Sequence, residues 1–201
     1  MYQYAIYNGG ITREQFLFYE MKITADLISK GYSKEEALKK IIDENLYQFP
    51  TERTIKIVAQ GCFRRLDALE NEMLVQELAT SGAELGKQIN LYAMMRYNRI
   101  VWDFMVTLIG EKYRTQDFSF SLKDVNVFLN GLREQVDGMN SWSDSTMQKI
   151  RQVLLKTLVE CGYLENTKST ELLPVTLFPE VENAIRANGE QVAFSAFNFF
   201  E

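Results

Sequence analysis

The chain has 201 residues, of which 46% are hydrophobic and 24% are charged. This composition is typical of a globular protein, excludes an intrinsically disordered one, and provides enough chain for one large domain or two small ones. Because 22 Lys and Arg stand against 27 Asp and Glu, the net charge is −5, and only local basic faces can bind nucleic acid.

Two helices are predicted before residue 50. Thr12 and Gln15 have the spacing of a capping box, which predicts a helix from Thr12 to about residue 30, ended by Gly31. Ser33 and Glu36 form a second capping box and predict a second helix with an apolar face.

The third predicted helix, which Thr51 caps and which runs to about Leu69, has the densest positive surface of the chain. At 100° per residue, its apolar side chains fill one sector and its polar side chains lie opposite, within about 80° of one another. An arginine, lysine and glutamine face on the third helix is typical of a helix-turn-helix that contacts DNA, and a merely solvated face is the alternative. The candidate DNA-binding residues here are Arg53, Lys56, Gln60 and Arg64, flanked by Arg65.

Further helices are predicted near residues 71–80, 83–95 and 97–114. The segment 82–87 superficially resembles a phosphate-binding loop, but Gln88 stands where Ser or Thr binds magnesium, so we interpret it as helix.

The most apolar stretch of the chain, residues 89–109, is not expected to cross a membrane. It carries Arg96, Arg99 and Asp103, and three ionisable groups within one bilayer depth are costly. The two arginines are either surface charges or partners of Asp103 at helical spacing. The first residues do not have the pattern of a signal peptide, and we expect a soluble, cytoplasmic protein without a membrane partner.

A second candidate DNA-binding unit begins at Ser121, which with Asp124 caps a helix over residues 121–137. The next helix spans about 145–161 and ends at Gly162. Its polar face carries Lys149, Gln152 and Lys156, opposite an apolar face.

Two extended segments, 163–165 and 171–177, follow this helix and place Lys168 near the tip between them. A helix followed by a small β-hairpin predicts a winged helix-turn-helix, and a hairpin that packs on a bundle without contacting DNA is the alternative. The candidate DNA-binding residues of this unit are Lys149, Gln152, Lys156 and Lys168.

The end of the chain is rich in phenylalanine. Pro179 begins a last short helix to about residue 187, and the phenylalanines after residue 193 are expected to pack on the body of the protein. If they were exposed, they would form a site for a protein partner.

Catalysis has little support in the residue types. The chain has no histidine, which excludes every Ser-His and Cys-His nucleophile pair. Cys62 and Cys161 fall on apolar helix faces and are expected to be buried free thiols; two cysteines alone cannot form an ordinary structural zinc site. We therefore expect no enzymatic activity, no cofactor, no metal and no small-molecule substrate.

Nearly the whole chain resembles the BrxA family of accessory proteins in BREX bacteriophage-exclusion systems. The resemblance rests on short motifs in a fixed order, namely Ile11-Thr12, Glu20, Gly31-Tyr32-Ser33, Glu44-Asn45-Leu46, Thr54, Arg64-Arg65-Leu66, Trp102-Asp103-Phe104, Trp142-Ser143, Thr146, Leu158 and Gly162-Tyr163-Leu164. It implies an all-helical or nearly all-helical fold, phage defence, double-stranded DNA binding without catalysis, and other defence-system proteins as partners. It also implies a partial likeness to NusB, a helical bundle that binds RNA.

These observations predict a mainly α helical bundle with an N-terminal helix-turn-helix-like domain at residues 1–70. A C-terminal helical domain with a winged-helix-like end is predicted at residues 71–201. The predicted function is double-stranded DNA binding with low sequence specificity, because few side chains suit base recognition. A protein scaffold without nucleic-acid contact and an RNA-binding regulator are the alternatives.

Overall fold

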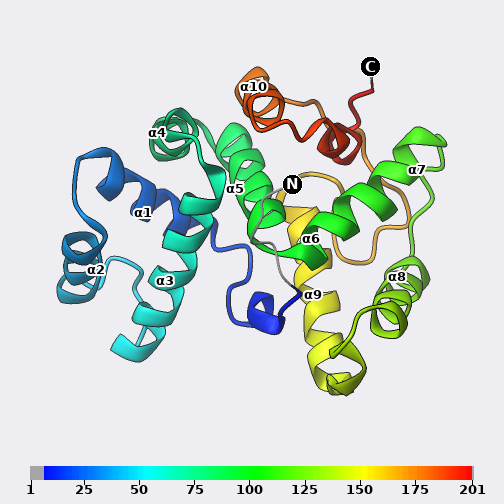
Figure 1. Cartoon of the computed structure of the whole chain (residues 1–201), viewed down its shortest axis with the longest axis horizontal. Helices are drawn as coiled ribbons and strands as arrows, with labels where there is room; N and C mark the ends of the chain where they lie inside the picture. Colours follow the sequence, from blue (N-terminus) through cyan, green and yellow to red (C-terminus); the bar gives the residue numbers. More distant parts are fainter. Residues whose placement is uncertain (1–6, 201) are drawn as a thin grey trace.

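A computed structural model describes residues 7–200, and these form ten α-helices joined by short 3-10, π and irregular segments (Figure 1). The first five helices are α1 (Phe18–Ser29), α2 (Lys34–Asp43), α3 (Glu52–Leu69), α4 (Glu72–Thr80) and α5 (Ala83–Tyr97). The last five are α6 (Arg99–Asp103), α7 (Gly110–Arg114), α8 (Leu122–Gln135), α9 (Asp144–Glu160) and α10 (Pro179–Ala187). The predicted mainly α class is confirmed.

Capping residues in the sequence predicted most helix ends correctly. The capping box at Ser33 forms in full, with Glu36 bonded back to the cap, and Ser121 forms the same arrangement with Asp124. The Thr51 side chain accepts the backbone N–H of Thr54 at the start of α3. These bonds satisfy amide groups that have no partner inside the helix, which is why the polar residues at these positions predict where helices begin.

The predicted first helix begins too early. Residues 9–12 form a 3-10 turn, η1 (Gly9–Thr12), and α1 begins only at Phe18, after Leu17 in a left-handed conformation with φ of 53°. The Thr12 hydroxyl donates to the carbonyl of Gly9 rather than capping a helix. The carbonyls of residues 14–16 accept hydrogen bonds from the guanidinium of Arg65 in α3. These bonds hold the segment in an irregular conformation.

The predicted break between the helices near residues 83–95 and 97–114 is confirmed, because Asn98 is extended and its side chain caps α6, so α5 and α6 are separate helices. The predicted helix over 97–114 is not α-helical throughout. Between α6 and α7 the chain widens into a π-helical segment, η2 (Phe104–Ile109). The pairing of Arg99 with Asp103 is confirmed, with 2.8 Å between Nε and Oδ1, whereas Arg96 is buried and its guanidinium pairs with Glu70 and Glu190.

One continuous apolar core runs through the described residues. It includes Ile55 and Cys62 from α3, Tyr92 from α5, and Leu154 from α9. In Figure 1, α1 to α4 lie at one end, α7 and α8 at the other, and α5, α6 and α9 between them. The core therefore crosses the predicted boundary at residues 70 and 71, and the two-domain division and the helix-turn-helix arrangement stay predictions.

The predicted β-hairpin after α9 does not form in the described residues. The segments 163–165 and 171–177 share one backbone bond, from the Leu173 N–H to the Tyr163 carbonyl at 2.9 Å. The second segment instead meets the chain before α8 through an isolated antiparallel bridge between Ser119 and Glu171. The Leu172 N–H donates to the Phe118 carbonyl beside this bridge. The competing partner comes from about 50 residues away in the chain, and no local pattern indicates it.

The phenylalanine-rich end packs on the body as predicted. Phe194 and Phe197 are buried in the 3-10 segment η4 (Gln191–Phe197), while Phe200 remains exposed. The Arg186 guanidinium lies 4.8 Å from the centre of the Phe194 ring, a cation–π contact. No helix in residues 7–200 has both the length and the apolar character needed to cross a membrane.

Candidate nucleic-acid interface

Helix α9 presents a broad polar face to solvent. Ser143 caps it, and Ile150, Leu154 and Leu158 are buried against the core. Lys149, Gln152 and Lys156 are exposed on the other side, as the helical spacing predicts.

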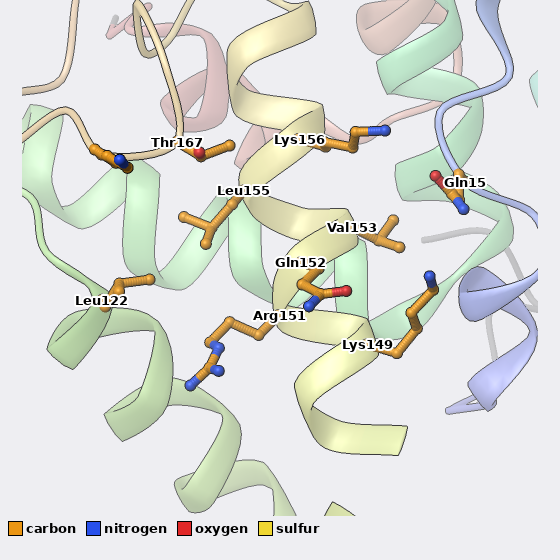
Figure 2. A pocket seen from close by; sticks show the side chains of 10 residues that line it. Gln15, Leu122, Lys149, Arg151, Gln152, Val153, Leu155, Lys156 and Thr167 are labelled. Atoms are coloured by element: carbon orange, nitrogen blue, oxygen red, sulfur yellow. The ribbon is translucent and has the colours of Figure 1, made fainter. Parts of the chain in front are cut away.

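A hollow of about 510 Å³ lies over this face of α9. Its walls are Gln15 on one side and, on the other, the first residue of α8 and the loop after α9. Figure 2 shows Lys149 and Lys156 directed toward Gln15, and Leu155 directed toward Leu122 and the loop. We call this feature the α9 hollow; its lining residues are Gln15, Leu122, Lys149, Arg151, Gln152, Val153, Leu155, Lys156, Thr167 and Lys168.

The α9 hollow gathers four cationic side chains and, among the described residues that line it, no carboxylate. All four residues predicted for the second DNA-binding unit are present, although the hairpin predicted to carry Lys168 is not. Sequence reasoning missed Arg151, because on the helical wheel it lies about 160° from Lys149 and outside the polar face. The Arg151 guanidinium donates to the Asn126 amide oxygen at 2.9 Å, and this bond ties α9 to α8.

The loop that carries Lys168 is held in place by backbone bonds. The Phe120 N–H donates to the Thr170 carbonyl at 2.9 Å, next to the bridge between Ser119 and Glu171. At its tip, the Lys168 N–H donates to the Asn166 side-chain oxygen at 2.9 Å. The loop is thus ordered beside α9 without a hairpin.

The positive face of α3 differs from that of α9 in the ion pairs that its side chains form. Arg53, Lys56, Gln60 and Arg64 are all exposed, as predicted. Lys56 forms an ion pair with Glu52 one turn earlier, and Arg64 forms one with Glu14 at 2.5 Å between Nη2 and Oε1. Within residues 7–200, Lys149, Lys156 and Lys168 form no such pair. The charge of α3 is therefore partly neutralised and that of the α9 hollow is not.

Arg65 is not available to DNA, because only 2% of the residue is exposed. Its guanidinium donates to three successive carbonyls, those of Glu14, Gln15 and Phe16; the bond to Gln15 is 2.6 Å and that to Phe16 is 3.0 Å. Burial lowers the pKa of this guanidinium from its ordinary value, and the hydrogen bonds to the carbonyls compensate in part for its desolvation. The assignment of Arg65 to the DNA-binding face is therefore corrected: it positions the segment that carries Gln15.

A second hollow, of about 440 Å³, connects the two basic helices. It shares Gln15 and Lys156 with the α9 hollow and is also lined by Arg13 and by Thr54 of α3. Arg13 is exposed here, and sequence reasoning missed it because residues 12–30 were predicted to be helical. Residues 13–16 thus join the polar surfaces of α3 and α9.

Comparisons with known proteins agree on one family. The BrxA family model matches residues 5–189. The chain is 32% identical over 188 residues to the BREX protein BrxA of Bacillus cereus (strain H3081.97), covering 93% of this chain and 94% of that protein. It is 25% identical over 173 residues to the BREX protein BrxA of Escherichia coli O9:H4 (strain HS), covering 86% and 80%. A crystal structure of an uncharacterized protein from Magnetospirillum magneticum has the same fold, with a TM-score of 0.82, 23% identity, and coverage of 95% and 97%.

Proposed function

The chain belongs to the BrxA family, and we propose that it is a non-enzymatic, double-stranded DNA-binding accessory protein of a BREX phage-defence system. Other proteins of that system are its proposed partners, and the cytoplasm is its proposed location.

The observation that carries the proposal is the concentration of unpaired positive charge at the α9 hollow. Lys149, Arg151, Lys156 and Lys168 lie around one depression in a chain whose net charge is −5. Phosphate contacts by lysine and arginine supply most of the affinity of sequence-independent DNA binding. On an acidic protein, a local basic surface attracts the DNA backbone, whereas much of the remaining surface repels it. DNA is therefore expected to contact this face.

The α9 hollow is proposed as the principal contact, and the α3 face as a secondary one. Arg53 and Gln60 extend the surface, and Arg13 lies between the two helices. The only uncharged amide groups on the two predicted faces are those of Gln60 and Gln152, so base recognition is limited and the expected sequence specificity is low.

The test is the salt dependence of duplex binding in the triple variant Lys149→Ala/Lys156→Ala/Lys168→Ala. Each phosphate contact that is lost lowers the slope of log affinity against log salt by roughly 0.9, so three contacts lower it by roughly 2.7. The three side chains are exposed, so the variant should fold normally, as circular dichroism can check.

The matched control is Lys30→Ala/Lys34→Ala/Lys39→Ala, which removes the same charge from exposed positions of the α1–α2 region. Its slope should equal that of the unchanged protein. Equal losses in both variants would assign binding to net charge, and an unchanged slope in the first would remove the α9 hollow from the DNA contact.

The scaffold alternative predicts no DNA binding at any salt concentration. It relied on an exposed aromatic tail, whereas Phe194 and Phe197 are buried. The RNA alternative predicts tighter binding to an RNA of the same length. Binding to several unrelated duplexes with similar affinity supports the proposal, and a preference above about 1,000-fold for one duplex would indicate a specific regulator instead.

A further inference from the structure

The shape of the α9 hollow differs from that of a surface that only contacts a duplex. A recognition helix reads bases by protruding into a major groove about 12 Å wide. Here α9 lies at the floor, with Gln15 on one side and Leu122 and Thr167 on the other (Figure 2). A depression of about 510 Å³ is far too small for a duplex but lies within the range of about 300–1,000 Å³ that small ligands occupy.

The chemistry of the lining divides into three kinds of group. The three lysines are placed to bind phosphate. Leu122, which is 51% exposed, supplies the accessible apolar surface, and Leu155 beside it is only 6% exposed. The Gln152 amide and the Thr167 hydroxyl make no hydrogen bond with the rest of the described chain, so both are free to donate and accept. A phosphate, an apolar flat face and polar edges are together the features of one nucleotide.

We propose that the α9 hollow receives a single unpaired nucleotide of a DNA strand, such as the first nucleotide of a single-stranded overhang. This inference rests on the proposed function and names the DNA that the site prefers. The lysines hold the phosphates on either side of the nucleotide, the base lies against Leu122, and Gln152 and Thr167 form hydrogen bonds with its edge. In a blunt duplex the bases are stacked, so only the phosphate contacts are made.

The test compares three DNAs by fluorescence anisotropy: a blunt duplex, the same duplex with a three-nucleotide overhang, and one whose overhang lacks bases. The abasic overhang carries the same phosphates, so any difference from the normal overhang comes from the bases alone. The normal overhang should bind about 10-fold more tightly than the abasic one, which should bind nearly as the blunt duplex does.

The variant Leu122→Ala should abolish the difference between normal and abasic overhangs while leaving blunt-duplex affinity and its salt slope unchanged. The matched control is Val127→Ala, which shortens an exposed apolar side chain of the same helix outside the hollow. The control should keep the 10-fold difference.

The outcomes separate this inference from the proposed function. Equal affinity for normal and abasic overhangs, with lysine-dependent binding of the blunt duplex, overturns only the inference. Competition by a free mononucleotide as effective as that of an overhang would also overturn it, because the hollow would then serve a small ligand. Failure to bind any of the three DNAs overturns both.

Discussion

Arg65 should be essential for stability even though it lies beside the exposed basic residues of α3. We consider Arg65→Met, which keeps most of the side-chain volume and removes the guanidinium. The change eliminates the hydrogen bonds to the carbonyls of Glu14, Gln15 and Phe16. Hydrogen bonds to charged groups contribute about 1.5–3 kcal/mol each.

These contributions are not additive, because residues 14–16 can shift and expose some carbonyls to water. The expected loss in the free energy of unfolding is therefore about 3–5 kcal/mol, less than the sum of three such bonds. For a domain of this size, 1 kcal/mol corresponds to about 2–4 °C in Tm, so Tm should fall by at least about 6 °C.

The assay is thermal and urea denaturation followed by circular dichroism. Arg53→Met is the matched control, since Arg53 is exposed on the same helix, and its effect should stay within about 0.5 kcal/mol. A stability of Arg65→Met equal to that of the control would refute this role of Arg65, because the three carbonyls would then need no buried cation.

Two further predictions concern the titratable groups. Burial raises the pKa of Cys62 to about 12. Ellman's reagent at about pH 8 should therefore leave this thiol unmodified in native Cys161→Ser protein and modify it in guanidinium chloride. Rapid reaction of the native protein would contradict the burial of Cys62. Hydrogen bonds from Ser119 and Lys112 lower the pKa of Asp117 from 3.8 to about 2, so this carboxylate stabilises the fold above about pH 4 and loses that effect as the pH falls toward 2. Asp117→Asn should lose less stability than the unchanged protein between those two pH values in urea titrations, and equal losses would refute the assignment.

The helices were predictable because their signals are local. A cap such as Ser33 and its partner Glu36 are three residues apart, and both bonds form within one turn. The irregular segment before α1 was not predictable in the same way. It is held by Arg65, about 50 residues later, and this long-range interaction overrides the capping pattern at Thr12.

Helical spacing also indicates the side of α3 on which Arg65 lies. Arg65 lies four residues after Gly61 and seven after Val58, both buried, so it belongs to the buried side of α3 rather than to the face of Arg64. A Cβ atom at Gly61 would lie 2.8 Å from the Glu14 side chain, so the segment passes close to the helix at this point. The sequence indicates the side on which Arg65 lies but not the carbonyls that it bonds.

The different charge environments of α3 and α9 show why periodicity identifies a face but not its charge. Lys156 has Glu160 one turn later, the spacing at which the two normally pair. In the structure the Glu160 carboxylate lies 2.9 Å from the Lys87 ammonium of α5 instead. Lys156 is consequently left for an external anion. On α3 the opposite holds, since Glu14, 50 residues earlier, neutralises Arg64. The two faces have the same residue types but differ in their capacity to bind phosphate. A carboxylate distant in the sequence forms an ion pair on the α3 face, whereas the lysines of the α9 face have no such partner among the described residues.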